Sequence, residues 1–148
     1  RTAALREMAR VARPGGTVAV VVPASLDAQP AYRPFVEMAA RHAGPEAVAL
    51  LGTYWACGDL GRLGDWFAAA GLDVVDTWTH LGTARFDSPE ALAATEIEGS
   101  PLAERISAEV DARIRGGARE VLAPFTAPGG ELHAPLRGHL VAGRPPRR

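Results

Sequence analysis

The stretch that decides the fold runs Leu5-Arg6-Glu7-Met8-Ala9-Arg10-Val11-Ala12-Arg13-Pro14-Gly15-Gly16-Thr17-Val18-Ala19-Val20-Val21-Val22. Its first apolar side chains recur at the spacing of one helical face, and they are Leu5, Met8, Ala9 and Ala12. This spacing predicts an amphipathic helix over residues 4–12. Because Arg13 precedes Pro14 and two glycines follow, the helix is expected to end within one residue of Arg13. Residues 17–22 are mostly β-branched and do not alternate, which predicts a strand buried on both faces.

Such a strand belongs in the interior of a mostly parallel sheet. Parallel neighbours are joined by crossovers whose helix packs on the sheet, and the helix at 4–12 is such a crossover. The strand before this helix and the parallel strands that flank residues 17–22 are missing from the sequence. We therefore expect residues 1–143 to be the C-terminal part of one α/β domain whose first half lies upstream of Arg1. Residues 144–148 are expected to be a disordered tail.

Composition excludes several classes of protein. The 148 residues carry 16 basic and 17 acidic side chains, so no long-range field attracts nucleic acid or an anionic membrane. The single cysteine, Cys57, excludes a disulfide framework and favours a cytoplasmic location. The apolar run at 18–24 is far shorter than the roughly 20 residues of a membrane span. We expect a cytoplasmic protein with no nucleic-acid or membrane partner, and the sequence leaves the oligomeric state open.

Turn and capping signals place the other elements. A helix is expected over 31–42, and another begins after Asp59 and ends at Gly71. A strand of alternating residues follows at 72–79. Ser88-Pro89-Glu90 predicts a helix over 89–98.

The last third of the sequence repeats these signals. Ser100-Pro101 predicts a second helix to about residue 123, and Gly116-Gly117 are expected to break or kink it. Its apolar stripe consists of Leu102, Ile106, Val110 and Ile114. Residues 132–142 are expected to form a closing strand in which Pro135 suits an edge or a bulge.

Two of these segments resemble a known family. The run from Leu5 to Gly16 and the strand after it resemble the helix, turn and fifth strand of class I S-adenosylmethionine-dependent methyltransferases. The stretch that contains Leu63, Phe67, Ala70-Gly71-Leu72 and Val74-Val75 is similar to the helix and sixth strand of that family. Residues 85–102 are similar, more loosely, to the helical insertion that some small-molecule methyltransferases place before the closing strand. The resemblance covers most of the chain.

The resemblance implies a Rossmann-like α/β sheet with antiparallel closing strands and a helical insertion at 88–125. It implies an enzyme that transfers a methyl group from S-adenosylmethionine to a small-molecule acceptor, with this chain on the acceptor side. In the family, the cofactor binds a glycine-rich loop after the first strand and an acid at the end of the second. Neither is present, and the glycines at 58–64 lack the spacing of a nucleotide loop. The upstream half is therefore expected to bind the cofactor, and this chain alone is expected to be inactive.

The ligand crevice of an open α/β sheet lies beyond the carboxyl ends of its strands. The polar members of the loop after Val22 are Ser25, Asp27 and Tyr32, which we interpret as candidate substrate-binding residues. Asp27 either acts as a general base or amine ligand, or shares with Ser25 the simpler role of capping the next helix. Tyr32 either lines the substrate pocket or packs in the core. The sequence identifies no catalytic residue.

Other candidates have simpler structural interpretations. Cys57 is interpreted as a small buried residue, and Tyr54, Trp55 and Trp78 as core aromatics or pocket walls. His133 and His139 could share a strand face, but Pro135 lies between them and no acidic partner stands at ligand spacing, so no metal site is predicted. Two alternative functions stay open. One is a non-catalytic α/β interaction module that uses the helices at 88–125. The other is a Rossmann-like enzyme such as a nicotinamide-dependent oxidoreductase, although the sequence has no lysine for a Tyr-x-x-x-Lys pair.

Overall fold

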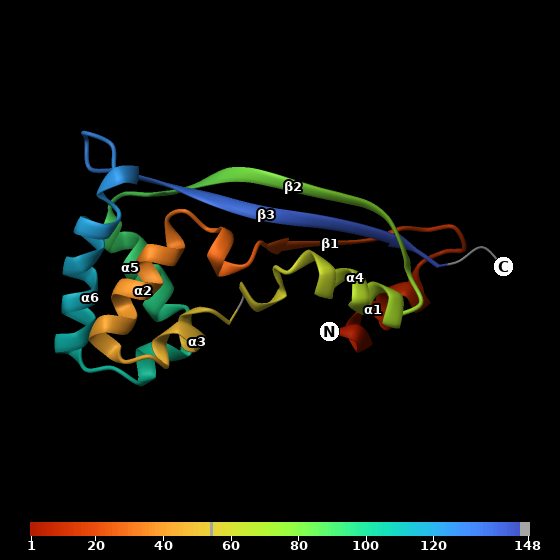
Figure 1. Cartoon of the computed structure of the whole chain (residues 1–148), viewed down its shortest axis with the longest axis horizontal. Coiled ribbons are helices and arrows are strands. Elements are labelled where there is room, and N and C mark those ends of the chain that lie inside the picture. Colours follow the sequence, from red (N-terminus) through yellow and green to blue (C-terminus); the bar gives the residue numbers. More distant parts are fainter. Residues whose placement is uncertain (54, 146–148) are drawn as a thin grey trace.

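A computed structural model describes residues 1–53 and 55–145 of the chain as a mixed α/β fold (Figure 1). Its helices are α1 (Thr2–Val11), α2 (Tyr32–Ala43), α3 (Ala47–Leu51), α4 (Leu60–Ala69), α5 (Pro89–Glu98) and α6 (Ala108–Val121). Its strands are β1 (Val18–Pro23), β2 (Asp73–Phe86) and β3 (Leu132–Arg144). Short 3-10 turns lie at Leu26–Ala28, Trp55–Cys57, Pro101–Glu104 and Ala123–Phe125. No helix in the described ranges has the length and apolar character needed to cross a membrane.

The three strands form one sheet in the order β1-β3-β2, and β3 runs antiparallel to both neighbours. β1 and β2 therefore point in the same direction, with a reversed strand between them. The closing strand is confirmed as antiparallel. Its Pro135 lies opposite Thr83 of β2, beyond the residues of β3 that pair with β1. The backbone N–H and C=O groups of Arg137 point toward β1. Those of Pro135, two residues away, lie on the same side, so the missing N–H of the proline breaks no hydrogen bond to β2.

The expectation of a strand buried on both faces at residues 17–22 is wrong for this chain. Among the described residues β1 pairs only with β3, so it is an edge strand. Val18 is 6% exposed because its side chain packs under the sheet, whereas Val21 is 72% exposed on the other face. That face and the outer edge of β1 have no neighbour within residues 1–53 and 55–145. The strand is apolar in composition, but no element among the described residues covers the face that carries Val21.

Helices α1 and α4 cover the sheet beside β1. The shared core consists of Leu5, Val18, Leu63, Phe67, Leu72 and Val141. Local signals fix the helix boundaries as predicted. Asp59 caps α4 by accepting a 2.7 Å hydrogen bond from the backbone N–H of Arg62, and Gly71 follows the helix with a φ of 77°. α1 and α4 thus pack against one face of the sheet and bury that side of β1.

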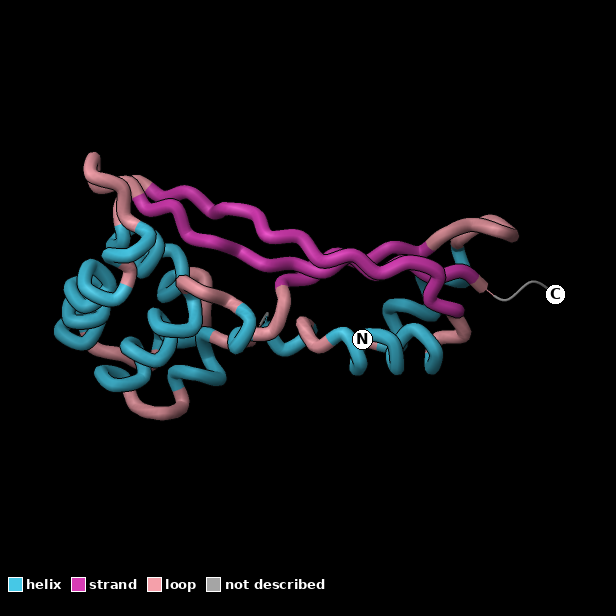
Figure 2. The backbone as a smooth tube through the Cα atoms, turned by 45° about the horizontal axis from the view of Figure 1, so that its top comes forward, coloured by secondary structure: helices cyan, strands magenta, loops and turns pink. Residues whose placement is uncertain are grey.

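The other helices form a second group at the far end of β2 and β3, which we call the helical module: α2, α3, α5 and α6. Its core includes Phe35, Leu51, Leu92, Leu102, Ile114, Leu122 and Leu132. Leu132 of β3 and Phe86 of β2 belong to the opposite sheet face from Val141, because side chains alternate along a strand. Both helix groups nevertheless lie below the strands in Figure 1, since the long strands twist about each other between their ends (Figure 2).

The helix predicted from residue 101 to about 123 is corrected by the structure. A 3-10 turn occupies Pro101–Glu104, and α6 begins after Ser107, whose hydroxyl accepts from the backbone N–H of Val110. Gly116 and Gly117 do not interrupt α6. Gly117 packs so closely on α2 that an added Cβ would lie 2.8 Å from the Met38 sulfur. The glycine therefore serves helix packing rather than a turn.

Two further boundaries differ from expectation. The strand expected at 72–79 extends to Phe86, because β3 continues to pair with it as far as Leu132. The tail was expected from residue 144, but Arg144 is the last residue of β3, and its Nε donates to the Thr17 hydroxyl at 3.0 Å. Residues 146–148 of the expected tail lie outside the described residues.

Candidate functional site

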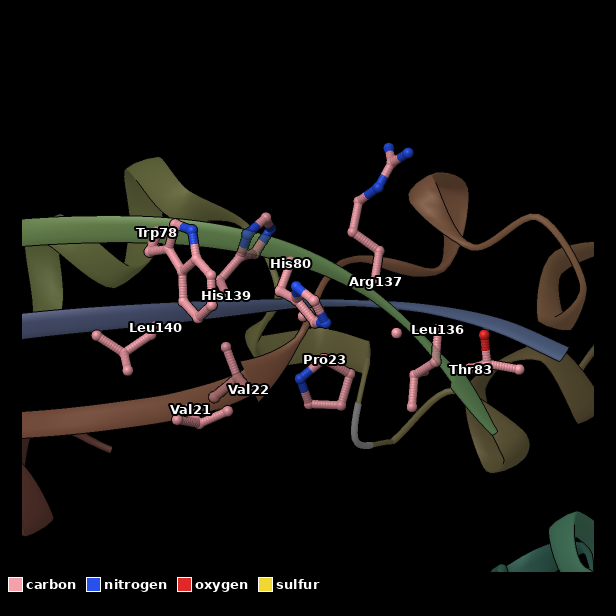
Figure 3. A pocket seen from close by; sticks show the side chains of 12 residues that line it. Val21, Val22, Pro23, Trp78, His80, Thr83, Leu136, Arg137, His139 and Leu140 are labelled. Carbon is pink, nitrogen blue, oxygen red and sulfur yellow. The ribbon is translucent and has the colours of Figure 1, made fainter. Parts of the chain in front are cut away.

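A cavity of about 480 Å³ lies on the sheet beside the C-terminal end of β1 (Figure 3). All three strands contribute to its wall. Its lining residues are Val21, Val22, Pro23, Trp78, His80, Gly82, Thr83, Leu136, Arg137, Gly138, His139 and Leu140. The volume falls in the range of small-molecule sites, and the end of β1 is the place where the sequence predicted a ligand crevice.

Apolar side chains dominate this cavity. Val21 and Trp78 are 72% and 59% exposed, and they contribute to the uncovered sheet face that we call the open face. The Trp78 ring lies against His80 with 5.3 Å between ring centroids. Arg137 directs its guanidinium away from the cavity in Figure 3. No carboxylate is among the lining residues, so the cavity suits an apolar or aromatic group better than an amine or a ribose.

The end of β1 is fastened by one buried side chain, Gln29. Its Nε2 donates to the carbonyl oxygens of Ala24 at 3.0 Å and Arg137 at 2.8 Å. Its Oε1 accepts from the backbone N–H of Arg137 at 2.9 Å. Gln29 is 1% exposed and satisfies backbone groups of β3 just beyond the last residue that β1 pairs with. It therefore holds the loop after β1 against β3.

A second fastening lies at Gly58. Its carbonyl oxygen accepts from the backbone N–H of Ser25 at 3.2 Å. A Cβ on Gly58 would lie 2.2 Å from backbone atoms of Ala24 and Ser25, so only glycine fits there. His139 reaches the same point from β3, since its ring is hydrogen-bonded to the Gly58 backbone and its Nδ1 lies 2.8 Å from the Thr79 hydroxyl. Burial lowers the pKa of His139, which favours a neutral ring in this role.

The three predicted substrate-binding residues do not converge. Ser25 is half-buried beside Gly58, and its side chain makes no capping hydrogen bond. The Asp27 side chain is 88% exposed and lies 3.9 Å from the Arg33 Nε. Tyr32 is 4% exposed in the core of the helical module, with its ring 5.0 Å from that of Trp55. None of the three lines the 480 Å³ cavity. Their role in substrate binding stays a prediction.

Tyr32 lies near a carboxylate that the sequence analysis did not single out, Glu96 of α5. Burial raises the pKa of Glu96 to about 7, and it raises the pKa of Tyr32 to about 12 with a smaller contribution from the Glu96 charge. Burial is the one cause of the raised Glu96 pKa, and no cation among the described residues acts against it. A carboxyl that titrates near neutral pH is a candidate for proton transfer or for binding a polar ligand group.

Glu96→Gln is expected to stabilise the chain at pH 8 by about 1–2 kcal/mol, because it removes a partly buried charge. The folded-state pKa lies above the unfolded value of 4.5, so the wild-type chain loses stability as pH rises from 4.5 toward 7. Urea unfolding at pH 5 and pH 8 checks this. The difference in unfolding free energy between pH 5 and pH 8 should be smaller in the variant than in the wild-type chain. A variant that is less stable than wild type at pH 8 would contradict the assignment.

The other aromatic and sulfur candidates have separate locations. Tyr54 lies outside the described residues, Trp55 packs in the core of the helical module, and Trp78 lines the cavity. Cys57 is half-buried and lines a smaller cavity of about 170 Å³ between α1 and α4. In residues 1–53 and 55–145 no three metal-ligating side chains come together.

Gln29, Gly58 and Glu96 were all missed by sequence reasoning. Gln29 stands in a loop that also contains the polar residues Ser25 and Asp27, and nothing in the sequence marks it as the one with a buried hydrogen-bonding role. Gly58 carries no signal beyond the glycine itself. Glu96 lies on a helix whose other glutamates are exposed or paired with arginine, so only the packing distinguishes it.

No protein-family model fits the chain, and no curated protein matches it significantly.

Proposed function

We propose that this chain is the acceptor-side part of a class I S-adenosylmethionine-dependent methyltransferase, which transfers a methyl group to a small-molecule acceptor. An upstream part of the same domain supplies the remaining strands and the cofactor loop. The single cysteine of this chain favours a cytoplasmic location.

The observation that carries this proposal is the free outer edge of β1. α1 leads through Pro14-Gly15-Gly16 directly into β1, as a crossover helix leads into a parallel strand. The register pairs Val20 and Val22 with β3 through the backbone, so the N–H groups of Ala19 and Val21 point to the outer edge. A further strand parallel to β1 would satisfy these groups.

The open face supports the same conclusion. Val21 of β1 and Trp78 of β2 are large apolar side chains left more than half exposed on this face. Monomeric proteins rarely leave such patches uncovered. A parallel sheet carries helices on both faces, and α1 and α4 cover only one of them here. An upstream part with strands and helices would complete both the edge and the face.

The residues of this chain do not fit the cofactor itself. The cavity at the end of β1 has no carboxylate for a ribose, and no glycine-rich loop follows β1. What the chain offers is an apolar wall from Val21, Trp78 and Leu140, with the helical module at the end of the strand. Methyl transfer depends mainly on alignment of donor and acceptor, so a rigid wall that orients an apolar acceptor is a sufficient contribution.

The alternative of an interaction module depended on an exposed apolar stripe on the helices at 88–125. Leu102 is 1% exposed and Ile114 is fully buried, and the residues between them pack partly against the same core. The stripe therefore serves the helical module itself. For the oxidoreductase alternative, the sequence still has no lysine to complete the pair of the short-chain type.

Calorimetry with S-adenosylmethionine tests the proposal. The 148-residue chain is expected to bind weakly, with a Kd of about 1 mM or more, because it lacks the cofactor residues. The polypeptide extended through the upstream reading frame is expected to bind about 100-fold more tightly or better. Micromolar affinity of the 148-residue chain would contradict the proposal that the cofactor residues lie upstream of it. An extended polypeptide that does not bind S-adenosylmethionine would contradict the proposed function.

A further inference from the structure

We propose that a second copy of this chain pairs with the outer edge of β2, antiparallel to it, so that two sheets join into one. The proposal does not depend on the proposed function, because this edge lies on the far side of the sheet from β1.

The backbone of β2 offers a long free edge. Over its 14 residues no other strand of the described chain pairs with its outer side. The backbone N–H and C=O groups of Arg137 in β3 point toward β1. Because these groups alternate along a strand, those of Leu136, Gly138 and Leu140 point toward β2. The backbone groups of Thr77, Thr79, Leu81 and Thr83 consequently point outward. A free edge of this length is a template for strand pairing.

The side chains of β2 are exposed on both faces of the sheet. Trp78 is 59% exposed on the open face, and Leu81 is 52% exposed on the other. Exposed apolar side chains on both faces of an edge strand are unusual, since edge strands are normally protected by charges or short length. With Thr79 opposite Thr79 of the partner subunit, Trp78 lies opposite His80 of the partner subunit. Trp78 and Leu81 then each gain a cross-strand neighbour from the partner subunit.

The charges of β2 favour pairing with its own copy in the antiparallel direction. Asp73 and Asp76 lie at the start of the strand, and Arg85 lies near its end. Antiparallel pairing brings the acidic start of one copy beside the basic end of the other, twice per dimer. Asp87 lies beyond the strand and does not join the pairing. Parallel pairing would instead place acidic residues side by side, which is unfavourable.

Sedimentation of the full 148-residue chain over a range of concentrations tests the proposal. Dimers are expected at about 100 μM, with dissociation on dilution. Leu81→Pro removes one outward N–H and is expected to weaken the dimer by about tenfold or more. Val21→Pro is the matched control, because it removes an outward N–H from the β1 edge, and it should leave the dimer unchanged. Circular dichroism shows whether each variant stays folded.

Charge reversal provides a second test that leaves the backbone intact. Arg85→Asp alone is expected to weaken the dimer, and adding Asp73→Arg with Asp76→Arg is expected to restore it. A chain that stays monomeric at about 100 μM would overturn the proposal. A dimer lost in Val21→Pro but kept in Leu81→Pro would overturn it as well, because the β1 edge would then be the interface. Charge variants that leave dimerisation unchanged would also contradict it.

Discussion

Gly58→Ala is expected to destabilise the chain by more than about 4 kcal/mol, or to prevent folding. The added Cβ would lie 2.2 Å from Ala24 and Ser25 and 2.4 Å from the Pro23 carbonyl oxygen. All three are backbone atoms, so no side-chain rotation relieves the clash. The end of β1 or the turn around Gly58 must move, and the hydrogen bond from Ser25 is lost with it. Urea unfolding followed by circular dichroism measures the effect.

Gly64→Ala is the matched control. Gly64 lies within α4, and an added Cβ has no atom within 4 Å. Alanine is favoured over glycine in a helix, so this variant is expected to gain up to about 1 kcal/mol. If both variants unfold at the same denaturant concentration, the close contact at Gly58 is not present in solution.

Gln29→Glu is expected to cost about 3 kcal/mol at pH 7. The carboxylate keeps the size of the amide and can still accept from the Arg137 backbone N–H. It cannot donate to the carbonyl oxygens of Ala24 and Arg137, which lie at 3.0 and 2.8 Å from the amide nitrogen. A buried negative charge then faces two carbonyl dipoles.

Acidification provides the control for this variant. Burial and the carbonyl dipoles raise the pKa of the introduced carboxyl, so its penalty shrinks as pH falls and the protonated group regains one donor. The stability difference between variant and wild type should therefore narrow between pH 7 and pH 5. A difference that stays constant over this range would show that Gln29 does not make its buried hydrogen bonds.

Elements set by local signals were predicted well. α1, α4 and α5 have a capping residue, a proline or a terminal glycine at their ends, and these act within one turn of the helix. The Ser88 hydroxyl, for example, accepts from the backbone N–H of Ala91, as its position before Pro89 predicts. Such features depend on a few neighbouring residues, so they can be recognised without tertiary information.

Features that depend on distant contacts were not predictable in the same way. Gly117 continues α6 because Met38, far away in sequence, lies against it. Pro135 lies in β3, the central strand of the sheet. A proline is tolerated there because β1 ends before it could pair with residue 135. The burial of residues 17–22 was misjudged, since β1 pairs with only one strand among the described residues and Val21 is exposed.

The candidate site shows the same limit. The sequence located the end of β1 as the place of interest, and the 480 Å³ cavity lies there. It selected the polar residues Asp27 and Tyr32 by type, but one side chain points into solvent and the other into the core. Gln29 and Glu96 depend on side-chain direction and burial, which periodicity alone does not fix.

Amide hydrogen exchange at the edge of β1 tests the central claim most directly. In the 148-residue chain, the outward N–H groups of Ala19 and Val21 are expected to exchange rapidly, and those of Val20 and Val22 slowly. In the polypeptide extended upstream, Ala19 and Val21 should become as protected as Val20, because a parallel strand then pairs with β1. If Ala19 and Val21 exchange equally fast in both polypeptides, β1 is a true edge strand and the methyltransferase assignment is contradicted.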